Sequence, residues 1–270
     1  MFPVNKGKPM DKVEKMEKEK MSLMDRRNFL KLGLLSTASV LSTKPAIAAR
    51  DSSGGTANNG KVNTPLQKYA AKNYEHLLGG KLSGISDGQL KAHFGLYENY
   101  INKINEFEAK IKSFDTNNPN TIDYRGWHVD QTFMLNGAVL HEFYFSNLGI
   151  TDKEPKGSLK KIIERDFSSL QNFIGHLKLV GKVMRGWSMA AFNYRTGKLN
   201  VYGLDQHNQL VPAFVYPVLV LDVYEHAYMI DYGTDRKKYL DAFIANLNWK
   251  SVHERLENAL SMPFGDVVTV

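Results

Sequence analysis

The chain has no cysteine among its 270 residues, and it has no long apolar run. The missing thiol excludes disulfides, zinc–thiolate sites, iron–sulfur clusters and cysteine nucleophiles. A transition metal would therefore have to bind histidine or carboxylate ligands. No stretch reaches the roughly 18 uninterrupted apolar residues of a membrane-spanning helix, so we expect no transmembrane segment.

The net charge of +7 is concentrated near the N-terminus. Residues 1–49 hold 10 of the 35 Lys and Arg and 5 of the 28 Asp and Glu, which leaves a net charge of only +2 for residues 50–270. Nucleic-acid binding depends on a strongly basic surface that contacts phosphates. We therefore expect no nucleic-acid partner.

The first 49 residues have the layout of a bacterial signal peptide. Arg26 and Arg27 precede an apolar stretch at 32–41, which is too short to span a bilayer, and small residues at 46–49 provide a cleavage site. Paired arginines indicate the twin-arginine export machinery, which carries folded proteins. We expect an exported, periplasmic or extracytoplasmic protein with a linker at 50–63. A disordered basic tail is the alternative.

The spacing of apolar residues predicts the order of the elements along the rest of the chain. Helical spacing covers three stretches, 64–113, 129–148 and 158–176. The period then changes to that of strands, at 183–194, 199–204 and 214–221, and Pro217 indicates an edge or irregular position in the last of them. Helical spacing returns from Glu225 to the end.

This order predicts an α+β protein. The expected architecture is an N-terminal helical hairpin domain at 64–150, followed by a C-terminal α/β domain at 151–270. The second domain would contain a three-stranded antiparallel sheet flanked by helices.

Histidines and carboxylates are the only candidate transition-metal ligands. His93 and His141 lie among apolar and aromatic residues on predicted helices, while Asp222 and His226 follow a predicted strand with a spacing of four. Taken singly, each of these histidines is more typical of a buried structural residue than of a ligand. His207 is a weaker candidate for the same site, and the remaining histidines are expected to be structural or exposed: His76, His128, His176 and His253.

Four segments, taken together, carry more information than their members. They are 93–95 (His-Phe-Gly), 141–148 (His-Glu-Phe-Tyr-Phe-Ser-Asn-Leu), 186–187 (Gly-Trp) and 222–228 (Asp-Val-Tyr-Glu-His-Ala-Tyr). Over residues 64–258 this pattern resembles the iron/manganese superoxide dismutase family. The last segment is similar to that family's Asp-x-Trp-Glu-His-Ala-Tyr signature, with Tyr224 where tryptophan is usual.

The resemblance implies a mononuclear metal site and a reaction. Its ligands would be His93, His141, Asp222 and His226. The substrate would be superoxide, which is disproportionated to dioxygen and hydrogen peroxide. A non-catalytic metal-binding or scaffolding protein of the same fold is the alternative, and another redox activity at the same metal is a third possibility.

The resemblance also implies roles for residues around the metal. Gln206 would hydrogen-bond the metal-bound solvent, and Tyr100 would stand at the access funnel, so both are the predicted catalytic residues. In this family a glutamine from the sheet domain, combined with a glycine at the position of Gly137, is the manganese-type arrangement. We therefore expect one manganese ion per subunit, with iron as the alternative.

The remaining implied roles concern the pocket wall and the assembly. Trp187 and Tyr224 would line the metal pocket. Glu225 would reach across a homodimer interface to the ligand histidine of the partner, and a tetramer is also possible.

Three positions depart from the family pattern. Tyr97 stands near where a gateway histidine is expected, and Met229 replaces the tyrosine that would contact that histidine across the dimer. Asp235 precedes Arg236 where two arginines are common. These differences predict an altered access funnel around an unchanged set of ligands.

Overall fold

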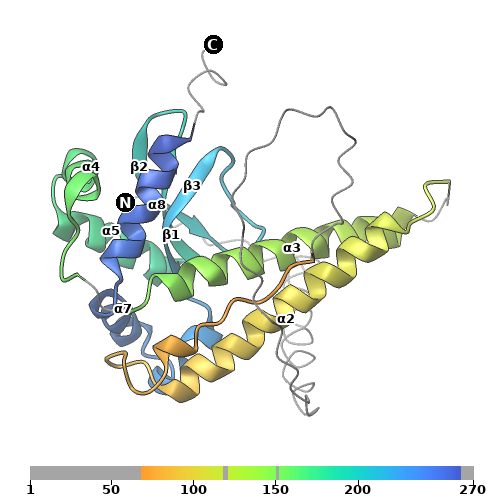
Figure 1. Cartoon of the computed structure of the whole chain (residues 1–270), viewed down its shortest axis with the longest axis horizontal. Coiled ribbons are helices and arrows are strands. Elements are labelled where there is room, and N and C mark those ends of the chain that lie inside the picture. The colour runs from red at the N-terminus through yellow and green to blue at the C-terminus, as the bar shows by residue number, and fades with distance from the viewer. Residues whose placement is uncertain (1–67, 118–120, 150–151, 263–270) are drawn as a thin grey trace, which may run out of the picture. The chain divides into compact units, whose positions relative to one another are not determined.

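The computed structural model describes residues 68–117, 121–149 and 152–262 (Figure 1). The predicted signal peptide and the linker at 50–63 lie outside the described residues. Among the described helices, none combines the length and the apolar character needed to cross a membrane.

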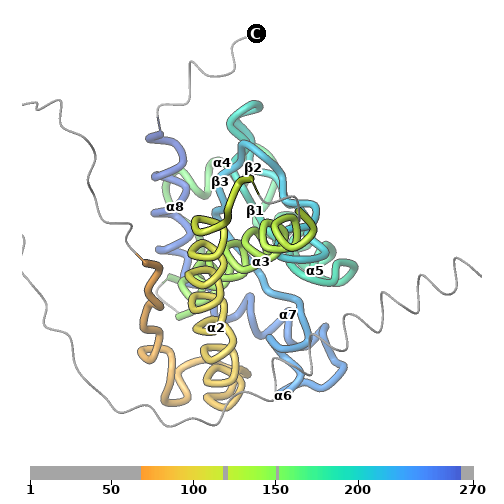
Figure 2. Tube along the Cα trace, turned by 90° about the vertical axis from the view of Figure 1, so that its right-hand side faces the viewer, coloured from red at the N-terminus to blue at the C-terminus, as the bar shows by residue number. Residues whose placement is uncertain are grey.

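Two long helices, α2 (Asp87–Lys112) and α3 (Thr121–Ser146), pack side by side as a hairpin (Figures 1 and 2). Ser86 caps α2 by accepting a hydrogen bond from the Gln89 backbone N–H at 3.1 Å, which satisfies one of the free donors of the first turn. The helical hairpin predicted from the sequence is therefore confirmed.

The helix boundaries differ from the predicted ones at both ends of this region. Residues 68–86 contain only a short 3-10 helix, η1 (Glu75–Leu77), where helical spacing was expected. The segment instead runs along α2, and the Asn105 side chain bonds both the backbone N–H and the carbonyl of Tyr69, at 2.9 Å each. Helix α3 starts earlier than predicted. Its first turns were missed because they are half-exposed and have little apolar periodicity.

The C-terminal domain begins with two short helices, α4 (Gly157–Phe167) and α5 (Leu170–Val183), where a single helix was expected. Ser168 separates them with a left-handed backbone, φ 68°, which ends α4. Ser169 then caps α5 by accepting from the Asn172 backbone N–H at 3.1 Å.

Three antiparallel strands follow, in the order β2-β1-β3. They are β1 (Trp187–Asn193), β2 (Lys198–Leu204) and β3 (Val215–Asp222). Pro217 lies on the edge strand β3, beside a register shift that leaves Val218 as the extra residue, so its missing N–H breaks no regular ladder. The three-stranded antiparallel sheet is as predicted.

Short helices complete the chain after the sheet. They are η2 (Glu225–Ala227), α6 (Met229–Tyr232), α7 (Arg236–Ala245) and α8 (Trp249–Ser261). Helices α3 and α8 contact β3, whereas α4 and α5 contact β2. The sheet is thus flanked by helices, and α3 brings the helical hairpin against the strand that ends at Asp222.

A buried arginine fixes the end of α3 to β3. Arg255, on α8, donates to the Val218 carbonyl at 3.0 Å, to the Ser146 hydroxyl at 2.5 Å and to the side-chain oxygen of Asn147. Asn147 in turn donates to the Val220 carbonyl at 2.6 Å. Burial lowers the pKa of Arg255 to about 10, so it stays charged at neutral pH, and a cation at a helix C-terminus is stabilised by the helix dipole.

Candidate metal centre

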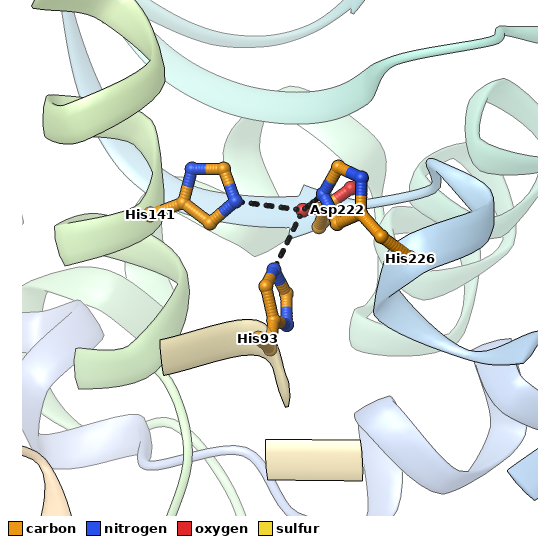
Figure 3. A group of neighbouring side chains, drawn as sticks. All are labelled: His93, His141, Asp222 and His226. Atoms are coloured by element: carbon orange, nitrogen blue, oxygen red, sulfur yellow. Dashed lines mark hydrogen bonds and ion pairs between the residues drawn. The ribbon is translucent and has the colours of Figure 1, made fainter. Parts of the chain in front are cut away.

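Four side chains from four separate elements converge in the core (Figure 3). His93 lies on α2, His141 on α3, Asp222 at the end of β3 and His226 in η2. Each offers one ligand atom, and these atoms all lie within 4.8 Å of one another. The structure therefore brings together the four residues that the sequence predicted as ligands.

The Asp222 carboxylate is the centre of this group. Its Oδ2 lies 3.1 Å from His93 Nε2, 3.1 Å from His226 Nε2 and 3.5 Å from His141 Nε2. Its Oδ1 accepts from the Tyr224 backbone N–H at 2.9 Å, which orients the carboxylate as the strand ends. All three imidazoles therefore direct an Nε2 toward one oxygen atom.

His141 gives the clearest indication that the cluster can bind a cation. Its Nδ1 donates to the Gly137 carbonyl at 2.6 Å, one helical turn back on α3. That bond leaves Nε2 without a proton in the neutral ring. Nε2 is fully buried and makes no hydrogen bond with any described residue. A buried nitrogen lone pair without a donor is costly unless a cation binds it.

The electrostatics of the cluster point the same way. Burial lowers the pKa of His93, and it lowers the pKa of His141 well below the ordinary value. Burial opposes ionisation of Asp222, but the neighbouring His226 and His93 outweigh it and keep the carboxyl pKa below its usual range. A buried carboxylate surrounded by imidazole nitrogens fits a transition-metal cation, because the ion supplies positive charge and binds these donor atoms together.

Aromatic rings enclose the cluster on the side of His141. The Tyr100 and Trp187 rings lie 5.2 Å and 5.1 Å from the His141 ring, centre to centre. Tyr224 stacks on His226 at 5.1 Å. A side chain at Gly137 would clash, because its Cβ would lie 2.9 Å from the Tyr100 ring. Tyr100, Trp187, Tyr224 and Gly137 thus all adjoin the cluster, where the resemblance placed them.

His207, and not Gln206, contacts the residues around the cluster. His207 is buried, accepts a hydrogen bond from Trp187 Nε1 at 2.9 Å on Nδ1, and bonds the Tyr100 hydroxyl at 2.8 Å through Nε2. Gln206 is half-buried, pairs through its backbone with Gln209, and makes no side-chain hydrogen bond to any described residue. The resemblance favoured Gln206, with His207 as the weaker candidate, and the turn after β2 has no periodicity that fixes which of these neighbours faces inward.

The positions that depart from the family pattern lie outside the cluster. The Tyr97 hydroxyl donates to Glu142 at 2.9 Å and accepts from the Lys72 backbone N–H at 2.9 Å, so Tyr97 fastens the segment before η1 instead of lining the pocket. Asp235 caps α7 by accepting from the Lys238 backbone N–H at 3.1 Å. Met229 is exposed.

Glu225 and Arg236 lie at the outer side of His226. The Glu225 side chain is 57% exposed, and its carboxylate is 4.0 Å from the Arg236 guanidinium. Arg236 also donates to the Tyr228 hydroxyl at 3.1 Å and to the Met184 carbonyl at 2.8 Å. The Glu225 side chain is therefore exposed, and Arg236 is its ion-pair partner among the described residues.

Comparison with known proteins gives a consistent result. Residues 155–255 match the family profile for the C-terminal domain of iron/manganese superoxide dismutases. The chain is similar to the superoxide dismutase [Fe] of Aquifex aeolicus, with 40% identity over 195 residues that cover 69% of this chain and 91% of that protein. It is also similar to the superoxide dismutase [Mn/Fe] of Aeropyrum pernix, with 32% identity over 145 residues that cover 52% of this chain and 68% of that protein.

We expect His141→Ala to abolish stable metal binding, because it removes one of four ligands. The affinity should fall by more than the roughly 10- to 100-fold typical of losing a residue that only supports a ligand. Titration of the metal-free protein with Fe²⁺ or Mn²⁺ measures this. His176→Ala, an exposed histidine on α5, is the control and should bind as the parent does. Parental affinity in His141→Ala would refute the ligand assignment.

Proposed function

The chain belongs to the iron/manganese superoxide dismutase family, and from that premise we propose that His93, His141, Asp222 and His226 hold one catalytic metal ion. The activity is that of a superoxide dismutase, an oxidoreductase. The observation that carries the proposal is the buried Asp222 carboxylate with three Nε2 atoms directed at it, one of which has no hydrogen-bond partner among the described residues.

The bound ion supplies one-electron chemistry, by which two superoxide anions and two protons yield dioxygen and hydrogen peroxide. The protein must therefore hold the ligands in place, exclude bulk water and present protons. The buried rings of Tyr100 and Trp187 keep the pocket dry on the His141 side.

The hydrogen bonds beside the cluster have a fixed direction. Trp187 Nε1–H can only donate, so His207 Nδ1 must accept. Burial lowers the pKa of His207 to about 3, which keeps the ring neutral, and its single proton then lies on Nε2. His207 therefore donates to the Tyr100 oxygen, and the Tyr100 hydroxyl keeps its own proton to donate elsewhere.

We assign the Tyr100 hydroxyl as a hydrogen-bond donor toward substrate. Burial raises the pKa of Tyr100 above its ordinary value, so the hydroxyl remains protonated at neutral pH. His207 acts by orienting Tyr100, which differs from the role predicted for Gln206, because both ring nitrogens of His207 are already bonded, to Trp187 and to Tyr100. This keeps Tyr100 as a catalytic residue and makes His207 a positioning residue.

Iron is the metal we propose as resident, with manganese as the alternative. The expectation of manganese depended on the Gln206 amide beside Gly137, and the residue that adjoins Gly137 is His207. Several relatives, including that of Aquifex aeolicus, are superoxide dismutases named for iron, whereas the Aeropyrum pernix protein is named for both metals. The same four ligands suit either ion.

A homodimer is proposed from the surface around His226. Met229 is 47% exposed and Ile230 is 62% exposed, and they follow the exposed Glu225 by four and five residues. Exposed apolar side chains next to a partly exposed ligand favour burial by a second copy. Glu225 would then accept a hydrogen bond from the partner subunit's ligand histidine.

The proposal of twin-arginine export rests on the sequence of residues 1–49 alone. It places the enzyme outside the cytoplasm.

Elemental analysis of the purified mature protein, alongside a superoxide-consumption assay, tests the function. We expect about one iron or manganese ion per chain and an activity proportional to metal content. A mass spectrum of the same sample reads the N-terminal residue and so tests cleavage after residue 49. Stoichiometric metal without superoxide consumption would favour the non-catalytic alternative, and absence of both metals would refute the proposed centre.

Replacing His207 by Ala should keep the metal but reduce turnover about 10- to 100-fold and shift the reduction potential, because Tyr100 loses the donor that orients it. Rapid kinetics and a redox titration measure the two effects. Gln206→Ala is the matched control and should behave as the parent. A loss of turnover in Gln206→Ala, with none in His207→Ala, would return the role to Gln206.

We expect Ile230→Glu and Glu225→Ala to weaken the dimer, because the first buries a charge in an apolar contact and the second removes the bridging carboxylate. Sedimentation over a range of concentrations should show at least about a tenfold higher dissociation constant for each. Leu179→Glu, at a residue 59% exposed on α5, is the control. A parent that is monomeric and fully active at every concentration would refute the bridge.

A further inference from the structure

The start of α2 is tied to the segment that carries His226. Gln89 Nε2 donates to the His226 carbonyl at 2.6 Å, and Gln89 Oε1 accepts from the Ile230 backbone N–H at 3.1 Å. One turn earlier, the Ser86 backbone N–H donates to the Asp231 carboxylate at 2.7 Å. Three hydrogen bonds therefore join residues 86–89 to residues 226–231.

Gln89 is suited to this contact by its position and burial. Its side chain is only 1% exposed, and both atoms of its amide are used. It lies four residues before His93 on α2, so the two residues share one face of the helix. A single helix thus supplies one ligand of the cluster and holds the main chain of another.

His226 needs such support more than the other ligands do. Its side chain is 20% exposed, whereas those of His93, His141 and Asp222 are 0–1% exposed. It lies in the three-residue η2, which is followed by the four-residue α6. Helices this short make few internal hydrogen bonds, so their positions depend on contacts with other elements.

We propose that Gln89 is a positioning residue for His226, which holds the His226 backbone so that the imidazole stays beside Asp222 and thereby slows release of the metal. This inference rests on the proposed function, because it takes the four residues as ligands. Loss of the amide would leave the part-buried His226 carbonyl and Ile230 N–H without this partner, and the least costly relief is movement of the segment toward water.

The chain offers a matched control in a second buried amide. The Asn246 side chain is fully buried and accepts from the Ser83 backbone N–H at 2.8 Å while donating to the Ser83 carbonyl at 2.7 Å. It fastens a segment before α2 in the same chemical manner. No proposed ligand lies on that segment, although Gly84 within it accepts a hydrogen bond from the Tyr232 hydroxyl. We expect loss of the Asn246 contact to act mainly on stability.

The test compares Gln89→Met with Asn246→Leu in the metal-loaded enzyme. Gln89→Met keeps the length of the side chain but loses both hydrogen bonds. We expect it to release metal to a chelator at least about tenfold faster and to change the optical spectrum of the bound ion. Asn246→Leu should lower the melting temperature while leaving the spectrum and the release rate close to those of the parent.

Hydrogen exchange gives a readout that does not need the metal. In the metal-free protein, the Ile230 amide should exchange at least about tenfold faster in Gln89→Met than in the parent, because its acceptor is gone. Asp231→Ala loses only the neighbouring bond to Ser86 and serves as a milder second variant. It should shift exchange and metal release in the same direction by a smaller factor.

The possible results separate this inference from the proposed function. Parental exchange and parental metal release in Gln89→Met would overturn it, as would equal acceleration of metal release by Asn246→Leu at the same loss of melting temperature. A parent chain that binds neither iron nor manganese would refute the proposed function, and the role of Gln89 as a ligand-positioning residue would fall with it. Faster hydrogen exchange at the Ile230 amide would then show only that Gln89 bonds this segment.

Discussion

A single negative charge at the end of β3 organises the molecule. The Asp222 carboxylate is fully buried, and an unpaired charge in the interior costs several kcal/mol. Its Oδ1 is bound by a backbone N–H, and its Oδ2 faces three imidazoles. The three Nε2 atoms and this oxygen form one set of metal ligands, so the arrangement is favourable when a cation binds.

Much of the remaining structure fixes the relative positions of the elements that bear the four residues of the cluster. Asp222 lies at the end of an edge strand, and the hydrogen bonds of Arg255 fix the end of α3 to that strand. His141 lies on α3 and Asp222 on this strand, so the Arg255 hydrogen bonds help to set the position of the His141 ring relative to the Asp222 carboxylate. Gln89 makes the equivalent connection from α2 to η2, which bear His93 and His226. Each connection is a buried polar group bonded to backbone atoms, which makes its geometry specific.

The parts that the sequence predicted well are those with strong periodicity or a distinctive local pattern. The helical hairpin, the antiparallel sheet and the convergence of His93, His141, Asp222 and His226 belong to this group. The resemblance favoured Gln206 and left His207 as the weaker candidate, and in the structure it is His207 that bonds Tyr100. A turn has no repeating face from which periodicity could have decided between these neighbours. The 68–86 segment was expected to be helical because its apolar spacing did not reveal side-chain hydrogen bonds to distant residues.

The exposure of the ligands is asymmetric, and this links the metal site to the surface. His93 and His141 are buried on the helices of the hairpin, whereas His226 is 20% exposed and is followed by the exposed Met229 and Ile230. Ile230 has two distinct roles there, because its side chain faces water while its backbone N–H bonds Gln89. A partner that covered these residues would therefore contact the same short segment that the buried Gln89 side chain bonds. Assembly and retention of the metal would then be coupled through the position of His226, without any change in the buried ligands.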